Sequence, residues 1–190
     1  MSNALRHPMT LDEFLSWEER QALRFEFDGL GPVAMTDETM AHATIQGNLS
    51  FSLQSRLRGG GCRAYGSDVK IEVDGSVRYP DAVVLCSPQI GSATVGRDPV
   101  VVFEILSPST SHTDRIVKVR EYGATASIQR YVILEQTSQA ATVFSRMNGV
   151  WASIVIDGDA DLALPEIGIV VPLADLYLDV AFPDEQATGE

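Results

Sequence analysis

Apolar residues recur along this chain with two spacings, and each spacing predicts one kind of element. The longest helical stripe has members four residues apart: Ile45, Leu49, Leu53 and Leu57. Residues at this spacing share one face of a helix, which can then pack against a core. We expect this helix to begin near Asp37 and Glu38, whose charge suits the positive end of the helix dipole, and to end at glycines 59–61. A shorter helix is expected over residues 11–19, behind a capping box that starts at Thr10.

Strict alternation of polar and apolar residues predicts a hairpin after the first helix. Residues 24–29 alternate and end in Asp-Gly, a pair that favours a tight turn, and residues 33–35 can form the return strand. Phe25 and Phe27 are the apolar members of the first strand, so we expect them to face the core. Glu26 must then face the other side of the ribbon.

The middle of the chain predicts several strands. Residues 69–73 alternate, an Asp-Gly pair turns the chain, and residues 77–86 are expected to return as one strand. Residues 82–85 and 100–103 are apolar without interruption. Such runs are typical of central strands that are covered on both faces of a sheet.

The remaining elements complete a mixed fold. A helix is expected over residues 114–127, a strand over 131–134, and a hairpin over 142–156 around an Asn-Gly pair. A short apolar segment at residues 170–177 closes the chain. This order predicts an α/β protein of mixed α+β type, with a central sheet flanked by helices.

Length and composition favour one domain. The chain has 190 residues, of which 45% are hydrophobic, and this is enough for a sizeable core. We expect a single domain over residues 1–183 and a disordered tail over residues 184–190.

No segment predicts export or membrane insertion. No apolar run approaches the roughly 20 residues of a membrane helix, and the N-terminus has no signal-peptide core. We therefore expect a cytoplasmic protein, and we expect Cys62 and Cys86 to be reduced thiols and not a disulfide.

The net charge of −12 opposes a nucleic-acid partner at first sight, because phosphate binding needs positive charge. Much of this charge lies in residues 157–190, which hold nine acidic residues and no Lys or Arg. The excess over residues 1–156 is only three negative charges, so the bulk charge does not exclude such a partner.

Two carboxylates interrupt the apolar strands. Asp81 follows Pro80 and precedes four apolar residues, and Glu104 lies within the apolar run 100–106. Burying an ionised carboxylate costs several kcal/mol unless a cation or hydrogen bonds compensate. Two such groups on neighbouring strands would repel each other unless one is protonated or a cation lies between them. Mg²⁺ or Mn²⁺, which prefer oxygen ligands, would resolve this, and the pattern is typical of metal-dependent hydrolysis.

Other partners could also compensate these charges. Each carboxylate could cap a strand end or pair with an arginine such as Arg78 or Arg130. Lys118, one of two lysines in the chain, shares a helix face with Asp114 four residues earlier. It could point at the carboxylates or form an ordinary ion pair with Asp114.

These residues carry a resemblance to a known family. The segments are Pro80-Asp81, Phe103-Glu104-Ile105-Leu106-Ser107-Pro108-Ser109-Thr110, and the helix residues Asp114, Lys118 and Tyr122. They resemble the Uma-type restriction endonucleases of the PD-(D/E)XK nuclease superfamily. The hairpin at residues 24–29, His42, and the closing segments 164–165 and 173–177 resemble the same family, so nearly the whole chain is covered.

The resemblance implies a fold, a cofactor and a reaction. The fold is a restriction-endonuclease-like central mixed sheet flanked by helices, and the reaction is metal-dependent hydrolysis of DNA phosphodiester bonds. Asp81 and Glu104, with Glu26 as a further ligand, are expected to hold Mg²⁺ or Mn²⁺. Lys118 is expected to act with these carboxylates in catalysis, and no organic cofactor is expected.

The resemblance also implies partners. DNA is the expected substrate, a homodimer is the expected assembly, and His42 and Arg115 are the expected substrate-binding residues, although His42 could equally be a core histidine. One departure stands out, because Leu106 occupies the position where the superfamily has a strand lysine. An alternative is therefore a catalytically inactive nuclease fold that binds nucleic acid or protein.

Overall fold

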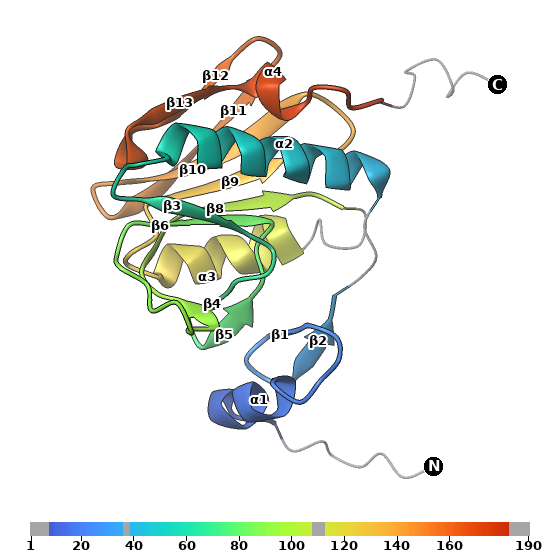
Figure 1. Cartoon of the computed structure of the whole chain (residues 1–190), viewed down its shortest axis with the longest axis vertical. Helices are drawn as coiled ribbons and strands as arrows, with labels where there is room; N and C mark the ends of the chain where they lie inside the picture. Colours follow the sequence, from blue (N-terminus) through green and yellow to red (C-terminus); the bar gives the residue numbers. More distant parts are fainter. Residues whose placement is uncertain (1–7, 36–38, 108–112, 183–190) are drawn as a thin grey trace, which may run out of the picture.

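A six-stranded mixed sheet forms the centre of the computed structural model, which describes residues 8–35, 39–107 and 113–182 (Figure 1). Its strands, in spatial order, are β11 (Val150–Asp157), β10 (Ala140–Met147), β9 (Arg130–Leu134), β8 (Pro99–Ile105), β6 (Ala82–Leu85) and β3 (Arg63–Gly66). The pair β8 and β9 is parallel, and the other neighbours are antiparallel. The mixed sheet expected from the sequence is confirmed.

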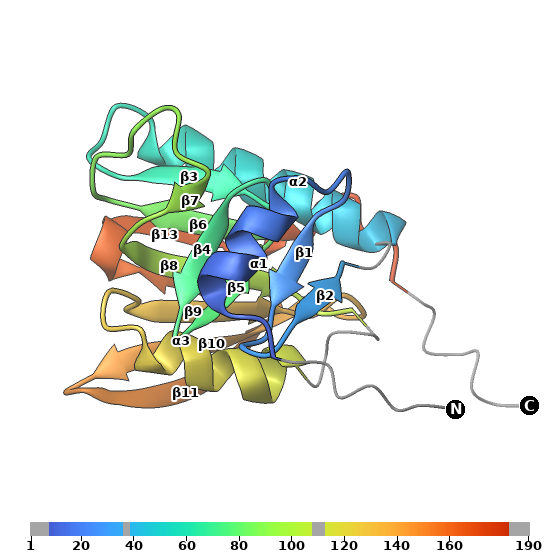
Figure 2. The same ribbon diagram turned by 90° about the horizontal axis from the view of Figure 1, so that it is seen from below.

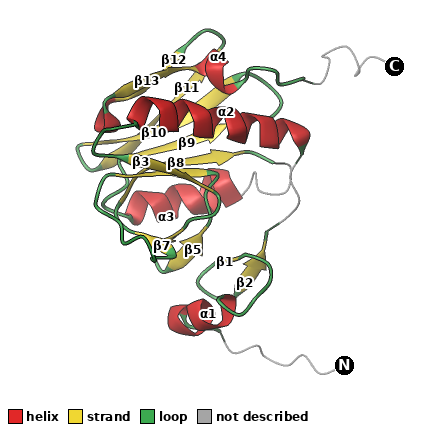
Figure 3. Cartoon of the chain, viewed as in Figure 1, coloured by secondary structure: helices red, strands yellow, loops and turns green. Residues whose placement is uncertain are grey.

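Helices cover both faces of this sheet (Figure 3). On one face lie α2 (Met40–Leu57), the hairpin of β12 (Asp161–Leu164) and β13 (Ile169–Pro172), and α4 (Leu173–Leu176), while α3 (Val119–Ala124) lies on the other. The apolar stripe predicted for α2 packs into the hydrophobic core on this face of the sheet. Within the described ranges, no helix is long and apolar enough to cross a membrane. Along β8, Val101, Phe103 and Ile105 join the α2 side, whereas Val102 and Leu106, the residue just after the strand, join the α3 side. Glu104 therefore faces the α3 side by strand alternation.

A second, five-stranded sheet lies beyond α3 (Figures 1 and 2). Its order is β2 (Pro32–Ala34), β1 (Phe25–Phe27), β5 (Ser76–Arg78), β4 (Lys70–Val73) and β7 (Val95–Gly96). The N-terminal helix α1 (Leu11–Glu18) packs on it through Phe14, which contacts Phe27 and Val77 in a small core. The predicted capping box at Thr10 is present, and the predicted hairpin corresponds to β1 and β2.

The single return strand expected over residues 77–86 is wrong. The chain forms β5 in one sheet, leaves it at Tyr79-Pro80-Asp81, and enters the other sheet as β6. Proline has no N–H group to donate to a strand ladder, so pairing breaks at Pro80. This crossing places Asp81 between the two sheets.

The helix expected over residues 114–127 also differs. It begins as a wide, π-type turn at Thr113–Lys118 and continues as α3, which ends at Ala124. Asp37, Glu38, Ser109, Thr110 and the tail 184–190 lie outside the described residues.

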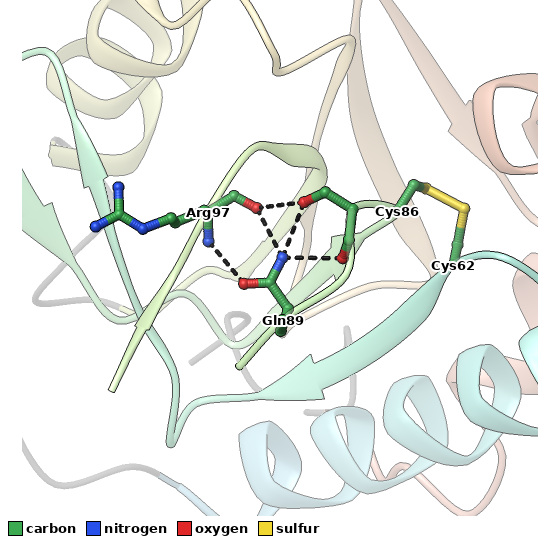
Figure 4. The surroundings of a disulfide bond; sticks show 5 residues. Cys62, Cys86, Gln89 and Arg97 are labelled. Atoms are coloured by element: carbon green, nitrogen blue, oxygen red, sulfur yellow. Dashed lines mark hydrogen bonds between the residues drawn. A yellow bond between two sulfur atoms is a disulfide. The ribbon is translucent and has the colours of Figure 1, made fainter. Parts of the chain in front are cut away.

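The two cysteines form a disulfide, so the expectation of reduced thiols is wrong (Figure 4). Strands β3 and β6 pair antiparallel with Arg63 opposite Leu85, and this register brings Cys62 opposite Cys86. The register could not be predicted from local sequence patterns, because the cysteines are 24 positions apart. Next to the disulfide, the side chain of Gln89 forms hydrogen bonds with the backbone of Ser87 and Arg97. These bonds connect the two ends of the loop after β6.

Removing the disulfide will destabilise the protein. A double variant Cys62→Ser/Cys86→Ser should lose about 3 kcal/mol of unfolding free energy, because the crosslink restricts the unfolded chain. Urea denaturation of the wild type with and without reductant measures this, and the double variant should not respond to reductant. Equal stability of the oxidised and reduced wild type would contradict the prediction.

Candidate active site

Asp81 is held at the crossing between the two sheets by three groups. Its Oδ2 atom accepts a hydrogen bond from the backbone N–H of Ile105 at 2.6 Å and lies 3.3 Å from Nε2 of His42. Its Oδ1 atom accepts a hydrogen bond from Nε2 of Gln46 at 3.1 Å. The backbone bond fixes Asp81 against the residue that follows Glu104, so the strand-neighbour arrangement expected from the sequence is present.

Glu104 points toward the helical segment that follows β8. One carboxylate oxygen, Oε1, accepts hydrogen bonds from Nζ of Lys118 and from the hydroxyl of Tyr122, both at 2.8 Å. Lys118 and Tyr122 are four residues apart, and both are buried on the side that faces β8. Neither Arg78 nor Arg130 pairs with Asp81 or Glu104, because their carboxylate partners are other residues.

Lys118 makes both contacts that the sequence left open. Its Nζ atom lies 2.8 Å from Glu104, 3.1 Å from Oδ1 of Asp114 and 3.6 Å from Oε1 of Glu26. Burial by itself would lower the pKa of Lys118, but the three carboxylates outweigh burial and raise the pKa well above its usual value. In this environment the protonated form of Lys118 is favoured.

Glu26 connects this lysine to a second buried cation. Its Oε2 atom accepts a hydrogen bond from Arg78 at 3.0 Å, and Oε1 accepts one from the backbone N–H of Tyr79 at 3.1 Å. Arg78 also donates from Nε and Nη2 to the two oxygens of Glu121, each at 2.7 Å. Burial lowers the pKa of Arg78, but the bonds and charges of Glu121 and Glu26 raise it beyond its normal value.

These groups border a partly enclosed cavity of about 420 Å³. Its walls come from the β1–β2 hairpin, the crossing between β5 and β6, the end of β8, and the wide helical turn. The lining residues are Glu26, Asp28, Val33, Ala34, Met35, His42, Arg78, Tyr79, Asp81, Glu104, Ile105, Ser107, Thr113, Asp114, Val117 and Lys118. Residues far apart in the sequence thus share one cavity.

The cavity carries more negative than positive charge. Burial raises the pKa of Glu104, Lys118 lowers it, and Asp114, Asp81 and Glu26 raise it again, so the pKa lies well above the usual range of a glutamate. The carboxyl group of Glu104 is therefore stabilised by binding a proton or by a further cation nearby.

The donor set fits a hard divalent cation bound partly through water. Among the described residues, no three His, Cys, Asp or Glu side chains gather closely enough to enclose an ion. Glu26 lines the same cavity and accepts bonds from Arg78 and Tyr79, and its part as a further ligand stays a prediction. Mg²⁺ is commonly held by one or two carboxylates and keeps waters or phosphate oxygens as its other ligands. Asp81 and Glu104 offer two carboxylates of this kind at one cavity.

The other candidates have different positions. His42 is buried, lines the cavity and lies next to Asp81, as expected for a residue near the site. Arg115 is absent from the lining, and its exposed side chain pairs with Glu135. Leu106 packs in the apolar cluster on the α3 side, and Lys118 reaches Glu104 from the helix instead.

The sequence did not indicate Gln46 or Glu121 of this network, and it suggested Arg78 only as a partner of Asp81 or Glu104. Gln46 lies one helical turn after His42 on α2, and that spacing was the available signal. The hydrogen bonds from Arg78 to Glu121 depend on the packing of α3 against β5, and no sequence pattern predicts that packing.

Comparisons with known proteins agree on a family. The model of the Uma2 family, described as putative restriction endonuclease, matches residues 11–174. The uncharacterised protein slr1290 of Synechocystis sp. is 31% identical over 175 residues, which cover 90% of this chain and 92% of that protein. A crystal structure of a putative nuclease of DUF820 from Anabaena variabilis superposes with a TM-score of 0.72 at 21% identity, and it covers 90% of this chain and 98% of its own.

Proposed function

Because the chain belongs to the Uma2 family of putative restriction endonucleases, we propose that it is a metal-dependent deoxyribonuclease that hydrolyses phosphodiester bonds. The observation that carries this proposal is the convergence of Lys118 and Tyr122 on one oxygen of Glu104, beside Asp81, in a shared cavity. Such a cluster of buried charges costs stability, and a plain structural role does not require it.

Asp81 and Glu104 are the proposed holders of Mg²⁺ or Mn²⁺. The ion would supply a water of lowered pKa and neutralise charge that develops on the phosphate. The chain's own contribution is to hold the carboxylates in place. The N–H of Ile105, Gln46 and His42 orient Asp81, while Tyr122 and Lys118 bind one oxygen of Glu104 and leave the other for the ion.

Lys118 is proposed to act as a fixed positive charge. Glu104, Glu26 and Asp114 raise its pKa, and its ammonium group can donate a hydrogen bond to a phosphate oxygen or a water. It thereby replaces the strand lysine that is absent at Leu106. Glu26 and Asp114 also lie close to its ammonium group, at 3.6 and 3.1 Å. A homodimer, and a direct contact of Arg115 with DNA, stay predictions.

Metal-dependent cleavage is the decisive test. Purified protein should cut DNA in Mg²⁺ or Mn²⁺ and stop when EDTA is added. Calorimetric titration with Mn²⁺ should show binding to the wild type and at least about tenfold weaker binding to Asp81→Asn, because the variant loses one anionic ligand. Arg115→Gln, outside the cavity lining, is the matched control for binding. Failure to cleave any DNA, with no carboxylate-dependent Mn²⁺ binding, would favour the alternative of an inactive binding module.

A further inference from the structure

The two proposed ligands lie inside the cavity and not on the open surface. Asp81 is 6% exposed and Glu104 is 5% exposed. A phosphate must therefore enter the cavity to approach them. The volume of about 420 Å³ is near the lower end of pockets that hold one drug-sized molecule, which is the size of a nucleotide. A DNA duplex keeps its bases paired and stacked in a wide rod and cannot insert one nucleotide without opening.

Part of the cavity is apolar. The β1–β2 hairpin contributes Val33, Ala34 and Met35 to the lining, and the helical segment contributes Val117. Val33 is 42% exposed and Met35 is 37% exposed, so this wall is accessible. Enzymes that take a nucleotide out of the stack hold its base between apolar or aromatic side chains. The hairpin wall is suited to that contact.

The charges near the cavity do not suit the backbone of a duplex. Duplex binding relies on many Lys and Arg contacts to phosphates. Among the described residues that line the cavity, the positively charged side chains are Arg78 and Lys118. Both form ion pairs with buried carboxylates, Arg78 with Glu121 and Lys118 with Glu104.

We propose that the substrate is DNA with an unpaired nucleotide, such as a single strand, an overhang or a bulge. The base of that nucleotide packs against Val33 and Met35 while its phosphate reaches Asp81 and Glu104. This inference rests on the proposed nuclease function and names its substrate class. It assigns the β1–β2 hairpin to substrate selection.

Three forms of one oligonucleotide test the inference. The wild type should cut the single strand, and a duplex with a central bulge, at least about tenfold faster in kcat/KM than the blunt duplex, because an unpaired base can reach the wall without breaking pairs. Faster or equal cleavage of the blunt duplex would overturn the inference and leave the proposed function intact.

Variants of the hairpin add a second measurement. Val33→Ser and Met35→Ser should each lower kcat/KM for the single strand about tenfold and leave Mn²⁺ binding unchanged, since neither apolar side chain offers a metal ligand. Leu30→Ser is the matched control, because Leu30 is an exposed apolar residue of the same hairpin that does not line the cavity. Equal losses for Leu30→Ser and Val33→Ser would overturn the role of the wall.

DNA-binding measurements distinguish a failure of the proposed nuclease activity from a failure of the proposed substrate preference. Fluorescence anisotropy in Ca²⁺, a hard cation that also prefers oxygen ligands, reports affinity without cleavage. Preferential binding of the single strand that Val33→Ser abolishes, together with no cleavage in Mg²⁺ or Mn²⁺, would overturn the nuclease activity and support the substrate preference. Tighter binding of the blunt duplex would overturn the preference.

Discussion

Replacing Glu104 by Gln will lower the rate of metal-dependent DNA cleavage by about a thousandfold, while the protein stays folded. The amide keeps an oxygen that can accept hydrogen bonds from Lys118 and Tyr122, so the local geometry can survive. It loses the negative charge that draws a divalent ion to the cavity. Charge stabilisation by a bound metal is worth several kcal/mol, and about 4 kcal/mol corresponds to a thousandfold in rate. Initial cleavage rates of the wild type and the variant measure the loss.

The same substitution should stabilise the metal-free protein. The pKa of Glu104 is raised in the folded state, chiefly by burial, so folding disfavours its ionised form. Protonated Glu104 therefore contributes to the unfolding free energy. This contribution is fully present below the pKa of a glutamate in the unfolded chain, about 4.3, and is lost as the pH rises through the folded-state pKa of Glu104. Above that range, Glu104→Gln should unfold at higher urea concentration than the wild type.

An exposed glutamate provides the control for both measurements. Glu72 on β4 is exposed, and Glu72→Gln should change neither the cleavage rate nor the urea midpoint. If Glu104→Gln cleaved DNA at the wild-type rate, Glu104 would not be a ligand. If the variant were less stable than the wild type at every pH, the bonds of the Glu104 carboxylate to Lys118 and Tyr122 would outweigh the cost of burying its charge.

The centre of the site could be predicted because its residues break a local rule. Asp81 and Glu104 are charged residues in apolar strand contexts, and Lys118 follows at helical spacing from Asp114. The structure places all of them at one cavity. The strands themselves follow from apolar runs, and the tight turns follow from Asp-Gly and Asn-Gly pairs, in which Asp74, Gly75, Asn148 and Gly149 all have positive φ.

The parts that escaped prediction depend on contacts between distant segments. Arg78 is the last residue of a short strand, and nothing nearby in the sequence shows that Glu26 and Glu121 both reach it. The disulfide depends on the register of β3 with β6. Residues 77–86 read as one strand in the apolar pattern, but Pro80 has no N–H to donate, so the pairing ends there and the chain divides between two sheets. Local patterns cannot report such long-range pairings.

Replacing Arg78 by Met will have the largest effect on stability, a loss of about 3–5 kcal/mol in unfolding free energy. Arg78 is 2% exposed and Glu121 is 2% exposed, so the variant leaves a buried carboxylate without its cation. Ser76, which also donates to Glu121 at 2.9 Å, cannot compensate a full charge. Urea denaturation measures the loss, and it should be larger than that of Arg130→Met, whose pair with Glu166 is less buried.

A double variant shows whether the loss comes from the stranded charge. In Arg78→Met/Glu121→Gln the carboxylate at position 121 is neutral, so a large part of the lost stability should return. Glu26 still lacks its arginine in this variant but keeps the N–H of Tyr79 and the ammonium of Lys118, so the recovery should be incomplete. If the double variant were no more stable than Arg78→Met, the arginine would act through packing and not through charge. In that case Glu26 and Glu121 would not depend on Arg78, and the ionic link between α3 and the β1–β2 hairpin would play no part in holding the active-site cavity together.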